Sequence, residues 1–306
     1  QDVFGSRISG GCRSLSGTSV ASPVVAGAVT LLASVIPERE RWLKLNPASM
    51  KQALVEGADR IPDITMYEQG AGFLNLQKSA KILKEYFPRA SLIPGTIDLT
   101  QCNYAWPHCK QPIYHSMMPL MFNATIVNGM GVRGSLDAEP KFTSSSSDLG
   151  EHLDVRFAFS ETLWPWTGYL AIYVRVKESG KMLKGKATGT ISFTVVSPPS
   201  MGPGGVFESD IRSSTVVVPI LVNVIPTPAR DKRILWDQFH NVRYPPGYVP
   251  RDNLDAKADV LDWHGDHPHT NFHGMYDALI YNGYYLEILT GPFTCFDASL
   301  YAAILI

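Results

Sequence analysis

Apolar side chains recur with a helical period along residues 1–92. Residues 20–36 form an apolar run rich in alanine and glycine, and Pro37 predicts its end. The pair Asn46-Pro47 is typical of an N-cap followed by the first residue of a helix, and an apolar stripe follows it. Apolar positions between residues 76 and 83 predict a third helix. We therefore expect three helices in this part of the chain.

A period of two replaces the helical period after residue 93. Apolar side chains occupy every second position in residues 170–176, 191–195 and 216–224, which is typical of half-buried strands. Pro219, in the last of these segments, favours a position near a sheet edge because proline cannot donate a ladder hydrogen bond. The pattern predicts an antiparallel β-sandwich over residues 93–228.

Residues 229–306 follow a third pattern. Predicted strands at 233–236, 284–289 and 301–306 flank a predicted helix at 271–281. Strands that are separated by a helix pair in parallel, so the pattern indicates an α/β unit. The final apolar run gives this unit a bare sheet edge, and we expect the unit to be incomplete. The predicted fold class is therefore mixed, with helices, then a sandwich, then an incomplete α/β domain.

Composition is that of a folded protein with more than one core. Of the 306 residues, 45% are apolar and 18% are charged, and we expect two or three domains. The formal net charge of −1 argues against a nucleic-acid partner, because phosphate binding favours a basic patch. No stretch supplies the ~20 apolar residues of a membrane span. Because the chain begins at Gln1 and not at Met, we expect a fragment, a processed product or an incomplete gene model.

Candidate chemistry begins at Ser19. The segment Gly17-Thr18-Ser19 precedes a predicted helix, and Pro23 lies four positions further on. A serine hydroxyl needs an adjacent base, and a helix start offers free N–H groups to a developing oxyanion. We expect Gly17 to form the turn and Thr18 to cap the helix, with Ser19 in its first turn. The plain alternative is a buried helix with a serine-rich cap.

Residues 17–27 resemble the nucleophile segment of the subtilisin-like serine proteases, the subtilases. The resemblance implies that Ser19 is the nucleophile, that its backbone N–H is one oxyanion donor, and that Gly17 and Thr18 support the turn. It also implies that residues 1–92 are the C-terminal helical part of an α/β catalytic domain. In the family, the catalytic Asp, His and oxyanion Asn precede the serine. The 18 residues before Ser19 contain no histidine, and Asp2 is their only carboxylate.

The second half of the chain makes the resemblance specific to one branch of the subtilases. Residues 225–240, 244–253 and 262–267 resemble the branch of the subtilases that cleaves luminal loops of membrane-anchored transcription factor precursors, in a plant-like form. This resemblance implies a protease of the secretory pathway lumen, held at the Golgi membrane by an anchor that this sequence does not contain. Calcium is possible by the same resemblance, but we can assign no residue to a calcium site. We expect this chain alone to be inactive, and the alternative is a truncated, non-catalytic luminal β-sandwich that binds a partner.

Two cysteines and one N-glycosylation sequon give information on the cellular compartment. Cys102 and Cys109 bracket a short loop that a disulfide could close, and the rival interpretation is a reduced pair or half of a metal site with His108. Asn123-Ala124-Thr125 is an N-glycosylation sequon. Together these features favour an oxidising, luminal environment.

Histidines and aspartates gather between residues 262 and 277. They are Asp262, His264, Asp266, His267, His269, His273 and Asp277. They could hold zinc, as in a metallohydrolase, or supply a surrogate base for Ser19. No pair has the helical i, i+4 spacing with an intervening Glu that makes a metalloprotease motif convincing. We therefore predict no metal site and expect these side chains to cap the following helix.

Overall fold

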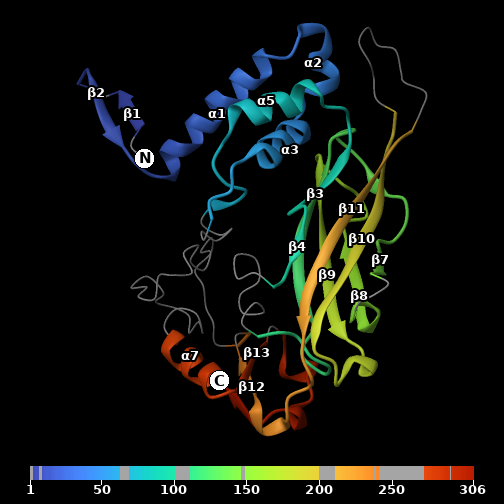
Figure 1. Ribbon diagram of the computed structural model, residues 1–306. Coiled ribbons are helices and arrows are strands. Elements are labelled where there is room, and N and C mark those ends of the chain that lie inside the picture. Colours follow the sequence, from blue (N-terminus) through green and yellow to red (C-terminus); the bar gives the residue numbers. More distant parts are fainter. Residues whose placement is uncertain are drawn as a thin grey trace.

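The computed structural model describes residues 3–6, 9–62, 69–100, 111–145, 149–199, 211–237, 239–240, 272–289 and 291–306. Figure 1 shows the helices of the N-terminal part at one end of an elongated β-sandwich. A small α/β unit lies at the other end. None of the described helices is long and apolar enough to cross a membrane.

The N-terminal part begins with a hairpin that the pattern did not predict. Strand β1 (Val3–Ser6) pairs antiparallel with β2 (Cys12–Leu15). The helices are α1 (Thr18–Ser34), α2 (Glu38–Lys44), α3 (Pro47–Gly57) and α5 (Leu76–Lys84). The three predicted helices are confirmed as α1, α3 and α5, whereas the short α2 was not predicted.

Local capping chemistry determines where α3 and α5 begin. The Asn46 side chain accepts a hydrogen bond from the Ser49 N–H at 2.8 Å, and Ser49 Oγ accepts one from the Asn46 N–H at 3.0 Å. This reciprocal capping box satisfies two N–H groups that a helix start leaves without partners. The Asn75 side chain caps α5 by accepting from the Lys78 N–H at 3.0 Å. The helices then share a small buried core of Leu32, Ile36, Met50, Ala53 and Leu83.

Two sheets form the sandwich. The first has the order β3 (Ala90–Ile93), β5 (Leu120–Asn128), β9 (Thr167–Val176) and β8 (Leu153–Phe159). The second has the order β4 (Ile97–Asp98), β11 (Arg212–Val224), β10 (Gly185–Ser197) and β6 (Ser135–Leu136), and β7 (Lys141–Ser144) also pairs with β10. Their inner faces enclose the largest apolar core of the described chain.

The predicted strands are confirmed as β9, β10 and β11. The long pairings of the sandwich are antiparallel as predicted, but single parallel bridges join Ile113 to Val224 and His115 to Val176. Strand β4 also runs parallel to β11, with Ile97 opposite Ile220. This pairing covers only two residues of β11, so Pro219 lies beside it and needs no ladder partner on that side. By sheet order β11 is an inner strand between β4 and β10, so the expected edge position is not found, and Pro219 is tolerated because it falls just outside the short β4 pairing.

The C-terminal unit is a parallel three-stranded sheet with one helix. Its strands are β12 (Arg233–Asp237), β13 (Tyr285–Leu289) and β14 (Ala303–Leu305), in the order β13-β12-β14, and its helix is α7 (His273–Tyr281). Both pairings are parallel, as the strand–helix–strand pattern predicted. Every residue of the central strand β12 is buried. Short 3₁₀ turns lie at Leu149–His152, Glu178–Gly180, Arg230–Lys232, Phe293–Cys295 and Ala298–Leu300.

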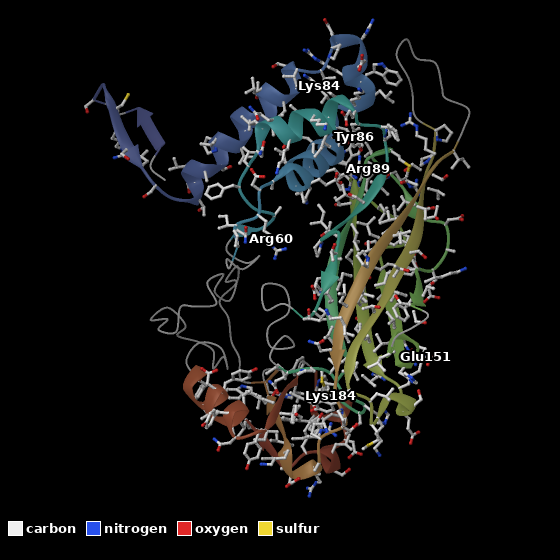
Figure 2. The ribbon with its side chains drawn as sticks, in the orientation of Figure 1. Arg60, Lys84, Tyr86, Arg89, Glu151 and Lys184 are labelled. Carbon is white, nitrogen blue, oxygen red and sulfur yellow. The ribbon has the colours of Figure 1, made fainter. Side chains whose placement is uncertain are left out.

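A buried polar cluster joins α3 to the sandwich. The Tyr86 hydroxyl donates to Gln52 Oε1 at 2.7 Å, and Gln52 Nε2 donates to the Arg89 carbonyl at 3.2 Å and to Ser91 Oγ at 2.8 Å. The Gly129 N–H also donates to the Arg89 carbonyl, at 2.9 Å. Figure 2 shows Tyr86 and Arg89 between the helices and the sandwich. A Cβ on Gly129 would lie 1.9 Å from the Tyr86 hydroxyl oxygen, so this close approach requires glycine.

Candidate active site

Ser19 lies in the first turn of α1, as predicted. Gly17 is the N-cap with φ 139° and ψ 164°, a backbone conformation that favours glycine. Its carbonyl accepts from the N–H groups of Val20 at 3.0 Å and Ala21 at 3.1 Å. The prediction that Thr18 caps the helix is wrong, because Thr18 is already the first helical residue and no side chain caps α1. A side-chain hydroxyl on the first helical residue lies beyond the N-cap position, so it does not accept from the N–H groups that an N-cap side chain satisfies.

The surroundings of Ser19 suit an incoming carbonyl group. The Ser19 side chain is exposed, and no hydrogen bond joins its hydroxyl to another residue in the described part of the chain. N–H groups in the first turn of a helix have no acceptor within that helix, and the helix dipole adds a partial positive charge there. An oxyanion that develops beside Ser19 would therefore meet free donors.

The rest of α1 buries only part of its apolar surface. Pro23 lies inside the helix, where it removes the N–H that would pair with the Ser19 carbonyl. Ala28 and Leu32 are buried, and α1 contacts α5. Val24 and Leu31 are 48% and 54% exposed. Only the second half of α1 thus contributes to the helical core.

No described histidine contacts Ser19. His115 Nδ1 lies 3.0 Å from the Val176 carbonyl oxygen, and His152 Nδ1 lies 2.9 Å from Ser179 Oγ. His240 Nδ1 lies 3.0 Å from the carboxylate of Asp237, at the end of β12. A histidine beside a carboxylate resembles the general base and its orienting group in a serine hydrolase. However, Figure 1 shows β12 and α1 at opposite ends of the molecule, so this pair cannot activate Ser19 in the described structure.

Several predicted residues lie outside the described part of the chain. These are Cys102, Cys109, His108, Asp262, His264, Asp266, His267 and His269. For His273 the structure describes the helical backbone at the start of α7 and not the side chain. Within the described ranges, no three His, Cys, Asp or Glu side chains gather in a way that could hold a metal ion. The disulfide therefore stays a prediction.

Asn123 is accessible in the described structure. It lies on β5 opposite Ala171 of β9, and its side chain is exposed. Its neighbours Phe122 and Ala124 face the sandwich core. The alternation along β5 thus directs Asn123 away from the core, which is the orientation that an attached glycan would require.

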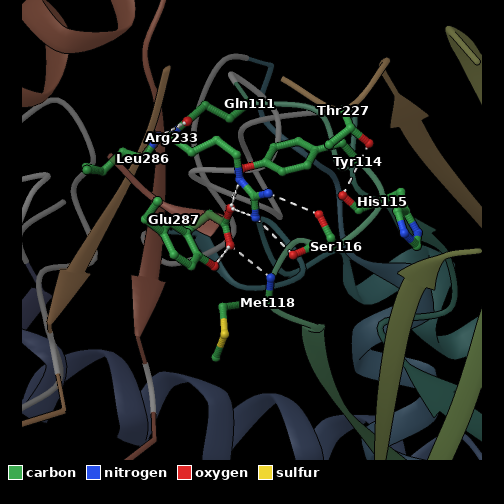
Figure 3. Close-up of polar contacts among 10 residues, drawn as sticks. Gln111, Tyr114, His115, Ser116, Met118, Thr227, Arg233, Leu286 and Glu287 are labelled. Atoms are coloured by element: carbon green, nitrogen blue, oxygen red, sulfur yellow. Dashed lines mark hydrogen bonds and ion pairs between the residues drawn. The ribbon is translucent and has the colours of Figure 1, made fainter. Parts of the chain in front are cut away.

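A buried ion pair that was not predicted from the sequence patterns lies where the sandwich meets the C-terminal unit, at the end opposite α1 (Figure 1 and Figure 3). Arg233 of β12 contacts Glu287 of β13, with Nη2 at 3.1 Å and Nε at 3.3 Å from Oε1. The Tyr301 hydroxyl donates to Glu287 Oε2 at 2.7 Å, the Met118 N–H donates to the same oxygen at 2.9 Å, and the Tyr114 hydroxyl donates to Oε1. The Glu287 carboxylate is therefore the centre of a polar cluster among apolar strands.

Burial sets the electrostatics of this cluster. It is the main reason that the pKa values of Tyr114 and Tyr301 lie well above the ordinary value for tyrosine, and the Glu287 carboxylate adds to it. Burial acts to lower the pKa of Arg233, but Glu287, Tyr114 and Tyr301 together outweigh it and the net shift is upward. Neutral phenols and a charged ion pair are thus the stable forms. We assign the cluster a structural role, because it joins the 113–118 loop of the sandwich to β12 and β13.

One sequence signal could have found this cluster. Glu287 is the only charged residue in the otherwise apolar and aromatic strand Tyr285–Leu289, and Arg233 opens a strand whose next three residues are apolar and whose last residue is Asp237. Charged residues at buried strand positions need partners of opposite charge. Two such residues on two predicted parallel neighbours indicate an ion pair.

Comparison with known proteins matches almost the whole chain. A model of the subtilase family matches residues 5–74. A model described as the third Ig-like domain of MBTPS1 matches residues 93–227, and a model described as its fourth GATase-like domain matches residues 228–306. The chain is 54% identical over 305 residues to subtilisin-like protease SBT6.1 of Arabidopsis thaliana, covering 100% of this chain and 29% of the relative. It is 53% identical over 303 residues to human membrane-bound transcription factor site-1 protease, covering 99% of this chain and 28% of the relative. The chain thus spans less than a third of the length of these relatives.

Proposed function

The chain belongs to the subtilase family, in the branch of site-1 protease, and from this premise we propose that it is part of a serine endopeptidase with Ser19 as the nucleophile. The observation that carries the proposal is the position of Ser19. Its hydroxyl is exposed in the first turn of α1, next to N–H groups that have no helical acceptor.

The proposed chemistry is acyl transfer. Ser19 Oγ attacks the carbonyl carbon of the scissile peptide bond, and its proton passes to a general base. The Ser19 backbone N–H and the positive end of α1 stabilise the oxyanion, while Gly17 and Thr18 form the turn that presents the hydroxyl. The tetrahedral intermediate then collapses, the peptide C–N bond breaks and the amine leaves with the proton from the base. Water attacks the resulting acyl-enzyme, which releases the carboxylic acid product and returns the proton to Ser19 Oγ.

We further propose that the 306 residues have no useful protease activity by themselves. No histidine precedes Ser19, and none of the described histidine side chains reaches it. In subtilisin, removal of the base alone lowers turnover by about 10⁶. In this proposal the base, its orienting carboxylate and a second oxyanion donor come from other segments of an active enzyme.

The substrates and location that we propose follow the relatives. Membrane-anchored transcription factor precursors would be cleaved at luminal loops, within the secretory pathway and at the Golgi membrane. The name of the human relative and the 53% identity support this assignment. The same proposal divides the chain into the end of a catalytic domain (1–92), a β-sandwich (93–228) and an α/β domain (229–306). It includes a glycan on Asn123 and a disulfide between Cys102 and Cys109.

A chimera tests the proposal directly. Residues 1–306 would replace the matching segment of human site-1 protease, and the chimera would be expressed in cells that lack the human enzyme. We expect cleavage of a membrane-bound transcription factor precursor by the chimera and none by its Ser19→Ala variant. Ser16→Ala, three residues earlier and exposed, is the matched control and should cleave normally.

Two outcomes would contradict the proposal. Equal cleavage by the parent chimera and the Ser19→Ala variant would show that Ser19 is not the nucleophile. A chimera that is folded and secreted normally, but cleaves nothing, would favour the alternative of a non-catalytic luminal binding protein.

A further inference from the structure

A pocket of about 360 Å³ lies at the junction of the sandwich and the C-terminal unit. Its charged lining residues are Lys181, Arg230 and Arg233, with His115 beside them, and none of its lining residues is a carboxylate. Hydroxyl groups of Ser116, Thr227 and Ser299 complete its polar surface. The volume falls in the range of small-molecule sites, roughly 300–1,000 Å³.

Two of the three cations lack a counter-charge among the described residues. Arg233 is neutralised by the buried carboxylate of Glu287. Arg230 Nε donates to the Ser299 carbonyl at 2.8 Å, which orients the guanidinium without neutralising it. The Lys181 side chain is exposed and forms no ion pair within the described part of the chain. The pocket therefore carries a net positive charge.

Hydrogen bonds from backbone and side-chain groups hold the walls of this pocket in place. The Thr227 N–H donates to the Lys181 carbonyl at 2.8 Å, and the Thr227 hydroxyl donates to the His115 carbonyl at 3.3 Å. Arg233 Nη2 donates to the Ser116 carbonyl at 2.9 Å, and Nη1 donates to Ser116 Oγ at 3.0 Å. Ser116 has a φ of 67°, a left-handed conformation that is uncommon for serine. These contacts fix donors from both units around one space before any ligand arrives.

We propose that this pocket binds an oxyanion of the phosphate or sulfate class, free or as the ester group of a small molecule. The Lys181 ammonium, the Arg230 guanidinium and the Ser116 hydroxyl, with no acidic group among the lining residues, are the kinds of donor that such an oxyanion requires. A divalent cation would find no carboxylate ligand there. The pocket is separate from Ser19, because Figure 1 shows α1 at the opposite end of the sandwich.

Isothermal titration of the 306-residue chain tests the proposal. The two probes are inorganic phosphate and a sugar phosphate monoester, each at constant ionic strength with chloride as the balancing anion. Lys181→Gln and Arg230→Gln should each weaken binding by about tenfold or more, because each removes a charge-assisted hydrogen bond. The matched control is Lys184→Gln. Lys184 is exposed in the same loop as Lys181, near the C-terminal unit in Figure 2, but it does not line the pocket.

The outcomes separate clearly. Saturable 1:1 binding that Lys181→Gln weakens and Lys184→Gln leaves unchanged supports the site. Tighter binding of the ester than of inorganic phosphate identifies an esterified ligand, and the reverse identifies a free anion. Absence of saturable binding for both probes, or equal weakening by Lys181→Gln and Lys184→Gln, overturns the proposal. Urea unfolding of each variant would verify its fold, and Lys181→Gln alone decides the test if Arg230→Gln is destabilised.

Discussion

Replacement of Glu287 by glutamine is the sharpest test of how the sandwich and the C-terminal unit are joined. The Glu287 side chain is 3% exposed, and its two oxygens accept from Arg233, Tyr114, Tyr301 and the Met118 N–H. Glutamine has nearly the same size, but its amide removes the negative charge and turns two hydrogens toward these donors. The variant therefore leaves the Arg233 guanidinium buried without a counter-charge.

The expected loss is large. Removing one partner of a buried ion pair costs about 3–5 kcal/mol, because the remaining charge keeps its desolvation penalty. The double variant Arg233→Met/Glu287→Gln removes both charges and should recover part of this loss, since no unpaired charge stays buried and the glutamine oxygen can still accept from the neighbouring hydroxyl and N–H groups. We therefore expect the double variant to be more stable than Glu287→Gln.

Urea unfolding provides the measurement. Circular dichroism and tryptophan fluorescence would give the free energy of unfolding of the parent, of the single variants Glu287→Gln and Arg233→Met, and of the double variant. Amide hydrogen exchange at Met118 would report the joint directly, because its N–H bonds to Glu287 Oε2. A Glu287→Gln variant within about 1 kcal/mol of the parent would refute the argument that desolvation dominates this pair. A double variant that loses the sum of the two single losses would refute it equally.

Three further predictions concern the helical part, each measured by urea unfolding. Gly129→Ala should lose about 1–3 kcal/mol, because its Cβ would collide with the Tyr86 hydroxyl; unchanged stability would contradict the close approach. Asn46→Ala should lose about 1–2 kcal/mol through its cap. Asn75→Ala removes the cap of α5 and an exposed Nδ2 bond to Asp59, whereas Asn46→Ala also removes a partly buried bond to the Gly129 carbonyl, so we expect the larger loss for Asn46, and a larger loss for Asn75 would contradict this. Burial raises the pKa of Tyr86 to about 12 in the folded state, whereas the unfolded state keeps the ordinary tyrosine pKa near 10. Between about pH 10 and 12 the folded state therefore binds this proton and the unfolded state does not, so the free energy of unfolding should fall as the pH rises. In the Tyr86→Phe variant, the slope of the unfolding free energy against pH should be smaller by the contribution of about one proton. An identical slope in parent and variant would contradict the raised pKa of Tyr86.

Local sequence chemistry predicted most of the regular elements. The Asn46-Pro47 pair marked the start of α3, and strict alternation marked β9, β10 and β11, because a single buried face imposes its period on the side chains. The parallel pairing of β12 with β13 followed from the intervening helix. The start of α1 was predicted to within one residue, because Ser19 lies in the first turn as expected but Gly17, and not Thr18, is the N-cap.

Features that depend on distant residues were missed. Helix α2 has seven residues, none of them buried, so it shows no apolar stripe. The parallel pair between β4 and β11 joins Ile97 to Ile220, and no local pattern records that partner. The cluster around Glu287 gathers residues from a loop, two strands and the segment before β14. Its charged members are visible in the sequence, but their partners become evident only when the sheet is assembled.

The central claim, that Ser19 is an activated nucleophile, is tested most directly by covalent labelling. The protein isolated from its source cells would be treated with a fluorophosphonate, digested with trypsin and analysed by mass spectrometry, with attention to the peptide that follows Arg13. We predict one phosphonate adduct on Ser19, and no adduct when the 306-residue polypeptide is treated alone. Labelling at another serine, or the absence of any adduct on a preparation that cleaves its substrate, would contradict the claim.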